Sequence, residues 1–197
     1  MKVRVNVVKD KTYADCVIGR CDTKDKIFEI IDTVNYVVGT DGSVEPYEKV
    51  KIRVTEYGEG KPTVIMQHNL DLDDFMSLAK DIFDSKKLNL DINYVEYKGS
   101  RSDKYDTGFE SRVLNITPFE AYNKGEGAYT VSFTQGPGES GDKGAVSPQK
   151  GGKTYNVKIP IGTKEARKLF LECFNYLNSK RTAFLVKNYD KVFIPHK

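Results

Sequence analysis

Residues 49–83 have the sequence KVKIRVTEYGEGKPTVIMQHNLDLDDFMSLAKDIF, which predicts two strands followed by a helix. In residues 50–55 branched apolar residues alternate with lysine, arginine and threonine, the period of a strand with one buried face. Two glycines, at 58 and 60, predict a turn, and residues 63–67 predict the second strand. Beyond it, apolar residues at helical spacing predict one buried helix face, formed by Leu72, Phe75, Met76, Ala79, Ile82 and Phe83.

More strands are predicted on the N-terminal side of this stretch. Residues 3–7 alternate between apolar and polar side chains, as a half-buried strand does. Residues 9–26 are rich in charge and predict a loop. Residues 27–38 are rich in β-branched and aromatic side chains, so they predict one long strand, which ends at a glycine-containing turn over residues 39–42.

Three aspartates, Asp71, Asp73 and Asp74, stand at the start of the predicted helix. Carboxylates are favourable there because they cap free backbone N–H groups and lie at the positive end of the helix dipole. The same carboxylates are also the ligand type that Mg²⁺ prefers, as in a nuclease. Capping is the favoured interpretation because it explains all three aspartates without a metal.

The second half of the chain repeats this plan. Residues 90–97 and 112–116 predict strands on either side of a polar loop at 99–108, and residues 129–133 predict a third strand. The Gly136-Pro137-Gly138 sequence is expected to end that strand and begin a loosely packed loop that continues to Gly152.

The last predicted strand covers residues 154–161, and Thr163 is expected to cap the helix that follows it. Residues 182–186 and 191–194 are expected to form a short tail after this helix. The apolar face of the helix consists of Ala166, Leu169, Phe170, Cys173, Phe174 and Leu177.

The two halves align with an offset of 91 residues, which places Leu70 on Ile161 and Leu78 on Leu169. The predicted fold is therefore α+β, with two repeated ββββα units whose antiparallel sheets pack against two amphipathic helices. The units cover residues 1–88 and 89–197, and we expect them to form one fused globular domain.

Composition restricts the class of protein. The chain has 197 residues, of which 39% are hydrophobic and 30% charged, so it can bury a core. It has no apolar run of membrane-spanning length and no signal-peptide core, and its three cysteines do not suit a disulfide scaffold, so we expect a cytoplasmic protein. Residues 1–98 carry a net charge of −3 and residues 99–197 carry +6, which favours a polyanionic partner on the second half.

Enzyme motifs are poorly matched. Gly151-Gly152-Lys153-Thr154 imitates the end of a phosphate-binding loop, but Ser147 stands where that motif needs its first glycine. The chain has two histidines and no paired cysteine spacing of the kind that binds zinc, and two histidines make a catalytic triad improbable. We therefore expect no enzyme activity, no cofactor and no metal.

Basic and aromatic residues are interleaved on the predicted strands and their loops. Single-stranded nucleic acid is held by cations that follow the phosphates and by rings that stack on the bases, although a solvated sheet face has a similar composition. The candidate binding residues are Tyr47, Lys49, Lys51, Arg53, Tyr57, Arg101, Lys104, Tyr122, Lys124, Lys153, Tyr155 and Lys158.

The arrangement of four strands and a helix, repeated once, resembles the Whirly and Pur-alpha-like superfamily of single-stranded nucleic-acid-binding proteins. The stretch from Ser111 to Leu177 is also similar to single-strand-binding proteins of bacterial mobile elements and phages. The Lys-Gly-Lys-Ala-Ala-Leu stretch of plant Whirly proteins is absent, so no family binding residue is transferred.

This resemblance implies a non-enzymatic protein of a bacterium or phage that binds single-stranded DNA, or RNA, with weak sequence preference. It also implies a homo-oligomer, a dimer or a tetramer. The alternative hypothesis is a module for protein interaction or phage assembly that uses its sheet edges or helices.

Overall fold

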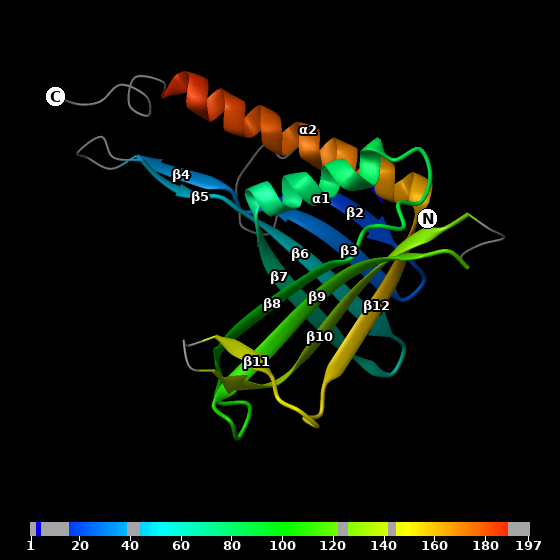
Figure 1. Ribbon diagram of the computed structural model, residues 1–197, viewed down its shortest axis with the longest axis vertical. Helices are drawn as coiled ribbons and strands as arrows, with labels where there is room; N and C mark the ends of the chain where they lie inside the picture. The colour runs from blue at the N-terminus through cyan, green and yellow to red at the C-terminus, as the bar shows by residue number, and fades with distance from the viewer. Residues whose placement is uncertain (1–2, 5–15, 39–43, 122–125, 142–144, 189–197) are drawn as a thin grey trace.

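The computed structural model describes residues 3–4, 16–38, 44–121, 126–141 and 145–188. In these residues two large antiparallel sheets cross beneath a pair of adjoining helices, and a two-stranded ribbon extends beside one of the helices (Figure 1). The α+β class and the antiparallel pairing expected from the sequence are confirmed.

The first sheet contains the stretch that begins at residue 49. Val50, Ile52 and Val54 are fully buried, and the lysines and arginine between them lie on the opposite face, as predicted. The order of the strands in this sheet is β1 (Val3–Arg4), β2 (Val17–Asp22), β3 (Lys26–Asp32), β6 (Lys49–Gly58) and β7 (Lys61–Asp71), and the separate ribbon pairs β4 (Asn35–Val38) with β5 (Val44–Tyr47).

The second sheet is centred on one long strand. That strand, β10, pairs with β9 on one side, and on the other side it pairs first with β12 and then with β11. The strands are β8 (Tyr94–Arg101), β9 (Phe109–Phe119), β10 (Ala128–Ser140), β11 (Val146–Pro148) and β12 (Tyr155–Gly162).

Helices α1 (Leu72–Asp84) and α2 (Thr163–Lys187) begin 91 residues apart, the offset predicted for the repeat. Phe170 of α2 is fully buried, and its ring centroid lies 6.5 Å from that of Phe28 in β3 and 5.8 Å from that of Phe75 in α1. The helix that closes the second unit therefore packs on the sheet of the first unit, and one hydrophobic cluster contains side chains of both. In the described part of the chain, no helix is long and apolar enough to cross a membrane.

Two predictions for the first unit were wrong. The expected loop over residues 9–26 contains strand β2, although residues 9–15 lie outside the described residues. The expected long strand over residues 27–38 is divided into β3 and β4, because the Asp32 carboxylate turns back and accepts a hydrogen bond from the Val34 N–H at 2.9 Å.

The second unit also departs from its prediction. The strand expected at residues 90–97 begins at Tyr94 and continues to Arg101, into the expected polar loop. Strand β10 runs through Gly136-Pro137-Gly138 to Ser140, and β11 occupies residues 146–148, so the loop expected from 136 to 152 is wrong there; residues 149–152 form a turn between strands, as expected. The glycines of β10 allow close packing, because a Cβ at Gly138 would lie 2.5 Å from a methyl group of Val146 in β11.

The helix ends differ in detail from the predictions. The N-cap of α2 is Gly162, while the Thr163 hydroxyl donates a hydrogen bond to the Gly127 carbonyl at 2.6 Å. Residues 182–186 belong to α2 and are not part of a tail, and residues 191–194 lie outside the described residues. Asp71 is the N-cap of α1, but its carboxylate makes no capping hydrogen bond and forms an ion pair with Lys49.

Candidate nucleic-acid interface

Lys49, Lys51 and Arg53, here called the β6 row, lie on one face of strand β6 as predicted, opposite its buried valines and isoleucine. Acidic neighbours on the same sheet balance two of these cations. Lys49 forms an ion pair with Asp71 of β7, and Arg53 forms one with Glu29 of β3 at 2.7 Å.

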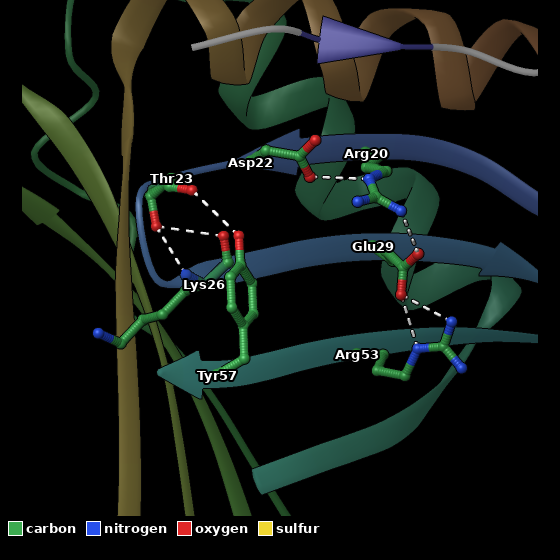
Figure 2. A network of polar contacts seen from close by, with 7 residues as sticks. All are labelled: Arg20, Asp22, Thr23, Lys26, Glu29, Arg53 and Tyr57. Carbon is green, nitrogen blue, oxygen red and sulfur yellow. Dashed lines mark hydrogen bonds and ion pairs between the residues drawn. The ribbon is translucent and has the colours of Figure 1, made fainter. Parts of the chain in front are cut away.

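Glu29 lies between two guanidinium groups (Figure 2). Its carboxylate is 2.7 Å from Arg53 and 3.5 Å from Arg20 of β2, and only 6% of the residue is exposed. Arg20 in turn donates to Asp22 at 2.7 Å. The two arginines and two acids therefore cancel locally, so this part of the first sheet offers less positive charge than its sequence indicates.

Two predicted stacking residues, Tyr47 and Tyr57, have exposed rings, with 47% and 38% of the residue accessible. Tyr57 follows the β6 row on the same strand, and its hydroxyl donates to the Thr23 carbonyl at 3.5 Å (Figure 2). Tyr47 ends strand β5, next to the start of β6. Both residues are therefore accessible to a ligand from solvent, which stacking on a base requires.

The second sheet carries a polar row that crosses four strands. Lys98 of β8 is opposite Arg112 of β9, Arg112 is opposite Gln135 of β10, and Gln135 is opposite Tyr155 of β12. Neighbouring strands are about 4.8 Å apart, so this polar row spans roughly 14 Å. It consists of two cations, an amide and an aromatic ring that is 58% exposed.

The polar row is on the same face as the core of this sheet. Two residues closer to the helices along β9, β10 and β12, the paired residues on the same face are Leu114, Phe133 and Val157, which are buried. On β9, β10 and β12 this face of the sheet therefore changes from apolar to polar between that buried set and the polar row. Strand alternation puts Tyr155 on the same side of β12 as the buried Val157, yet Tyr155 is exposed because it lies at the end of the strand, beyond the core.

A cavity of about 210 Å³ lies where the first sheet meets the polar row. In the described part of the chain, every charged residue on its wall is basic. The cavity brings together two predicted residues, Tyr47 and Lys49, and three that the prediction missed, His68, Lys98 and Arg112. Its lining residues are Tyr47, Lys49, His68, Asn69, Lys98, Gly99 and Arg112.

Glu96 of β8 connects the two sheets behind this cavity. Its carboxylate lies 2.7 Å from Lys98 and 3.6 Å from His68 of β7, and it accepts a hydrogen bond from the Tyr94 hydroxyl at 2.6 Å. Burial opposes ionisation of Glu96, but these contacts outweigh it and lower its pKa to about 2. Glu96 is therefore ionised at neutral pH and keeps the Lys98 ammonium at the cavity wall.

Arg112 is held from the other side of the cavity. Its Nε atom is 3.7 Å from Glu110, whose other carboxylate oxygen accepts a hydrogen bond from Gln135 at 2.6 Å. This Nε atom is buried and has no hydrogen-bond partner among the described residues. The guanidinium thus keeps donor capacity that the described residues do not use.

The other predicted binding residues are dispersed. Arg101 and Lys104 are exposed at the end of β8 and in the turn after it, and Lys153 is exposed just before β12. Lys158 is exposed on β12, but strand alternation puts it on the face opposite Tyr155. The last two candidates, Tyr122 and Lys124, lie outside the described residues.

The prediction missed Lys98, Arg112, Gln135 and His68. Alternation could have selected Lys98, but the strand was expected to end one residue before it. Arg112 was included in a predicted strand, yet only the pairing of β8, β9 and β10 brings it beside Lys98 and Gln135.

A larger cavity, of about 450 Å³, lies at the end of α1 and the start of α2. Its wall combines the basic residues Lys86, Lys87, Lys164 and Arg167 with Glu120 and Glu126. Lys164 and Glu126 are paired at 3.0 Å. The mixed charge makes it a weaker candidate for a polyanion than the smaller cavity.

No protein-family model matches the sequence, and no curated protein matches it. The structure is similar to that of WHY3 from Arabidopsis thaliana, with 12% identity, a TM-score of 0.55, and coverage of 85% of this chain and 92% of that chain. The structure is also similar to that of WHY1 from the same plant, with 9% identity, a TM-score of 0.52, and coverage of 90% of this chain and 94% of that chain.

A third similar structure is that of the plant transcriptional regulator PBF-2, with 14% identity, a TM-score of 0.52, and coverage of 90% of this chain and 95% of that chain. All three are Whirly proteins, so the resemblance expected from the sequence is confirmed at the level of the fold. At sequence identities this low, the comparison shows only that the folds are alike.

Proposed function

We propose that this chain is a non-enzymatic protein that binds single-stranded DNA with weak sequence preference. The observation that carries the proposal is the polar row, where two cations, an amide and an exposed tyrosine lie side by side across four strands. Lys98 and Arg112 would hold phosphates, and Tyr155 would stack on a base. Neither type of contact selects a base sequence strongly, which accounts for the weak preference.

The β6 row and its two tyrosines would extend this path along the first sheet. Because Lys49 lines the cavity with Lys98 and Arg112, a strand can pass from one sheet to the other across this point. Arg101, Lys104, Lys153 and Lys158 remain candidate contacts outside this path, and Tyr122 and Lys124, which lie outside the described residues, also remain candidates. The expected contribution of each residue of the β6 row is small where an acidic neighbour already compensates its charge.

Fluorescence anisotropy with a labelled single strand at two salt concentrations tests the proposal, with duplex DNA and RNA of the same sequence as comparisons. Counterion release predicts that the affinity falls steeply as salt rises. Replacing a stacking tyrosine costs about 1–3 kcal/mol of binding free energy with little change in salt dependence. Absence of binding to any single strand at low salt would falsify the proposal.

A matched pair of tyrosines makes the test specific to one face. Tyr155 and Tyr97 are exposed to a similar degree, 58% and 60%, on opposite faces of the second sheet. We expect Tyr155→Ala to weaken binding by the amount given above and Tyr97→Ala to have a much smaller effect. The opposite ranking would assign the interface to the other face.

We also propose that the chain self-associates as a dimer or tetramer in a bacterial or phage context. Helix α2 offers apolar surface for association, because its Leu171 and Val186 are 40% and 72% exposed and a second copy would cover them. Light scattering coupled to gel filtration measures the mass directly. A mass near 22.3 kDa at high protein concentration would contradict self-association.

A further inference from the structure

The cavity of about 210 Å³ has several basic side chains around one point, whereas a strand that lies along a sheet face needs only cations spaced along its length. Three basic side chains reach its wall from three different strands: Lys49 from β6, Lys98 from β8 and Arg112 from β9. These strands belong to two crossing sheets (Figure 1), so the three groups converge only because the chain is folded. Such convergence distinguishes a pocket from a row of surface cations.

The acidic partners of these cations leave donors for a ligand. An ammonium has three N–H donors and a guanidinium has five, whereas the structure pairs each cation with one carboxylate: Lys49 with Asp71, Lys98 with Glu96, and Arg112 with Glu110 at 3.7 Å. These three acidic residues are not among the groups that line the cavity. They fix the cations in place from behind, and they also lower the affinity for an anion, so the effect that we expect is moderate.

His68 gives a second, independent indication of a ligand. It lines the cavity, only 2% of the residue is exposed, and neither ring nitrogen has a hydrogen-bond partner among the described residues. A buried polar side chain without a partner is unfavourable unless water or a ligand supplies one. Its Nε2 atom lies 3.6 Å from the Glu96 carboxylate, so Nδ1 is the ring nitrogen that we assign to an oxygen atom of a ligand in the cavity.

The size of the cavity and its charge together select the ligand. Pockets for drug-sized molecules are about 300–1,000 Å³, so this cavity suits a smaller group. A phosphate monoester carries a charge of about −1.5 to −2 at neutral pH and offers three acceptor oxygens, whereas a diester inside a strand offers two free oxygens and one charge. Three converging cations match the monoester better.

We propose that this cavity binds a terminal phosphate of a nucleic-acid strand, with Lys49, Lys98 and Arg112 as its counter-ions and His68 as a hydrogen-bonding group. The proposal rests on the proposed function, because it adds an end-specific pocket to the same binding path. It goes beyond that function in predicting that the protein distinguishes a phosphorylated strand end from a hydroxyl end.

The first experiment compares three oligonucleotides of one sequence that carry an internal fluorophore and differ only at their ends: 5′-phosphate, 3′-phosphate, or hydroxyl at both ends. One additional charge-assisted hydrogen bond corresponds to roughly a tenfold change in affinity. We expect the intact protein to bind one phosphorylated strand roughly tenfold more tightly than the unphosphorylated one. The preferred end gives the direction in which the strand enters the cavity.

Substitutions in the cavity test whether the preference for a phosphorylated end arises there. Arg112→Gln and Lys98→Gln should each remove most of it, whereas Lys80→Gln, which removes the same charge from an exposed position on α1, should leave it unchanged. Circular dichroism and thermal melting check that each variant is folded. Equal binding of all three oligonucleotides to the intact protein would overturn the terminal-phosphate site and leave the proposed function standing.

A second measurement does not depend on binding of a strand. The chain has two histidines, His68 and His196, so their imidazole NMR signals can be assigned with a His196→Gln variant. Inorganic phosphate, titrated at constant ionic strength and pH against chloride, should shift the His68 signals saturably in the intact protein and not in Arg112→Gln. If His68 responds but no oligonucleotide binds, the proposed function fails while the phosphate pocket stands; an unresponsive His68 would contradict the pocket.

Discussion

The two sheets use the same alternation of apolar and polar residues with opposite results. In the first sheet the cations of the β6 row lie on the face opposite the core, and neighbouring strands supply acids such as Glu29 to compensate them. In the second sheet the polar row continues the core face itself, and it faces a cavity shared with the first sheet. Positive charge on a strand is thus a weak sign of a site, whereas convergence across two sheets is a stronger one.

The largest effect is expected where the two units share their core. Phe170→Ala removes a fully buried ring that lies between Phe28 and Phe75, so we expect it to lower the free energy of unfolding by about 3–5 kcal/mol. Leu171→Ala, next to it and 40% exposed, should change it by less than about 1 kcal/mol. Urea denaturation measures both, and similar small effects would indicate that α2 is not packed on the first sheet.

A smaller effect is expected at the close packing in the second sheet. Gly138→Ala would put a Cβ atom 2.5 Å from Val146, and we expect this overpacking to destabilise the protein by about 1–3 kcal/mol. Adding Val146→Ala removes the obstructing methyl groups, so the double variant should be less destabilised than the sum of the two single variants. Strict additivity would show that β10 and β11 do not meet there.

Acid titration examines the contact between the sheets. Because the pKa of Glu96 is lowered to about 2 in the folded protein, its contribution to stability is complete above its ordinary value of 4.5 and is lost as pH falls toward 2. Allowing for solvent screening, we expect this contribution to be on the order of 1–2 kcal/mol. Unfolding free energies measured across this pH range should decrease less steeply in Glu96→Gln; identical profiles would contradict the role of this carboxylate.

The smallest effect separates the two sheets as phosphate-binding surfaces. Each phosphate contact to a single strand contributes about 0.7 to the slope of log affinity against log salt. We expect Arg112→Gln to lower the slope by about that amount, and Arg53→Ala to lower it less, because Glu29 already compensates Arg53. A larger change for Arg53 would move the main phosphate contacts to the first sheet.

The sequence by itself determined the repeating plan and most of the buried residues. Hydrophobic periodicity is a local property, so it identified the faces of β6, α1 and the first half of α2, and the offset of 91 residues between the helices. It failed where the same local sequence pattern is compatible with two different structures. Glycine and proline at 136–138 indicate a break, but β10 continues through them, and Gly138 permits close contact with Val146 of β11 while Gly136 permits close contact with Thr154.

Only the tertiary structure decided which cations can act together. Strand alternation put the three residues of the β6 row on one face, but it could not show that Asp71 and Glu29 stand beside two of them. Lys98, Arg112, Gln135 and Tyr155 are spread over 58 positions of sequence, and the pairing of four strands makes them neighbours. Ion pairs, cross-strand rows and cavities depend on distances between segments far apart in the chain, and local sequence patterns contain no such distances.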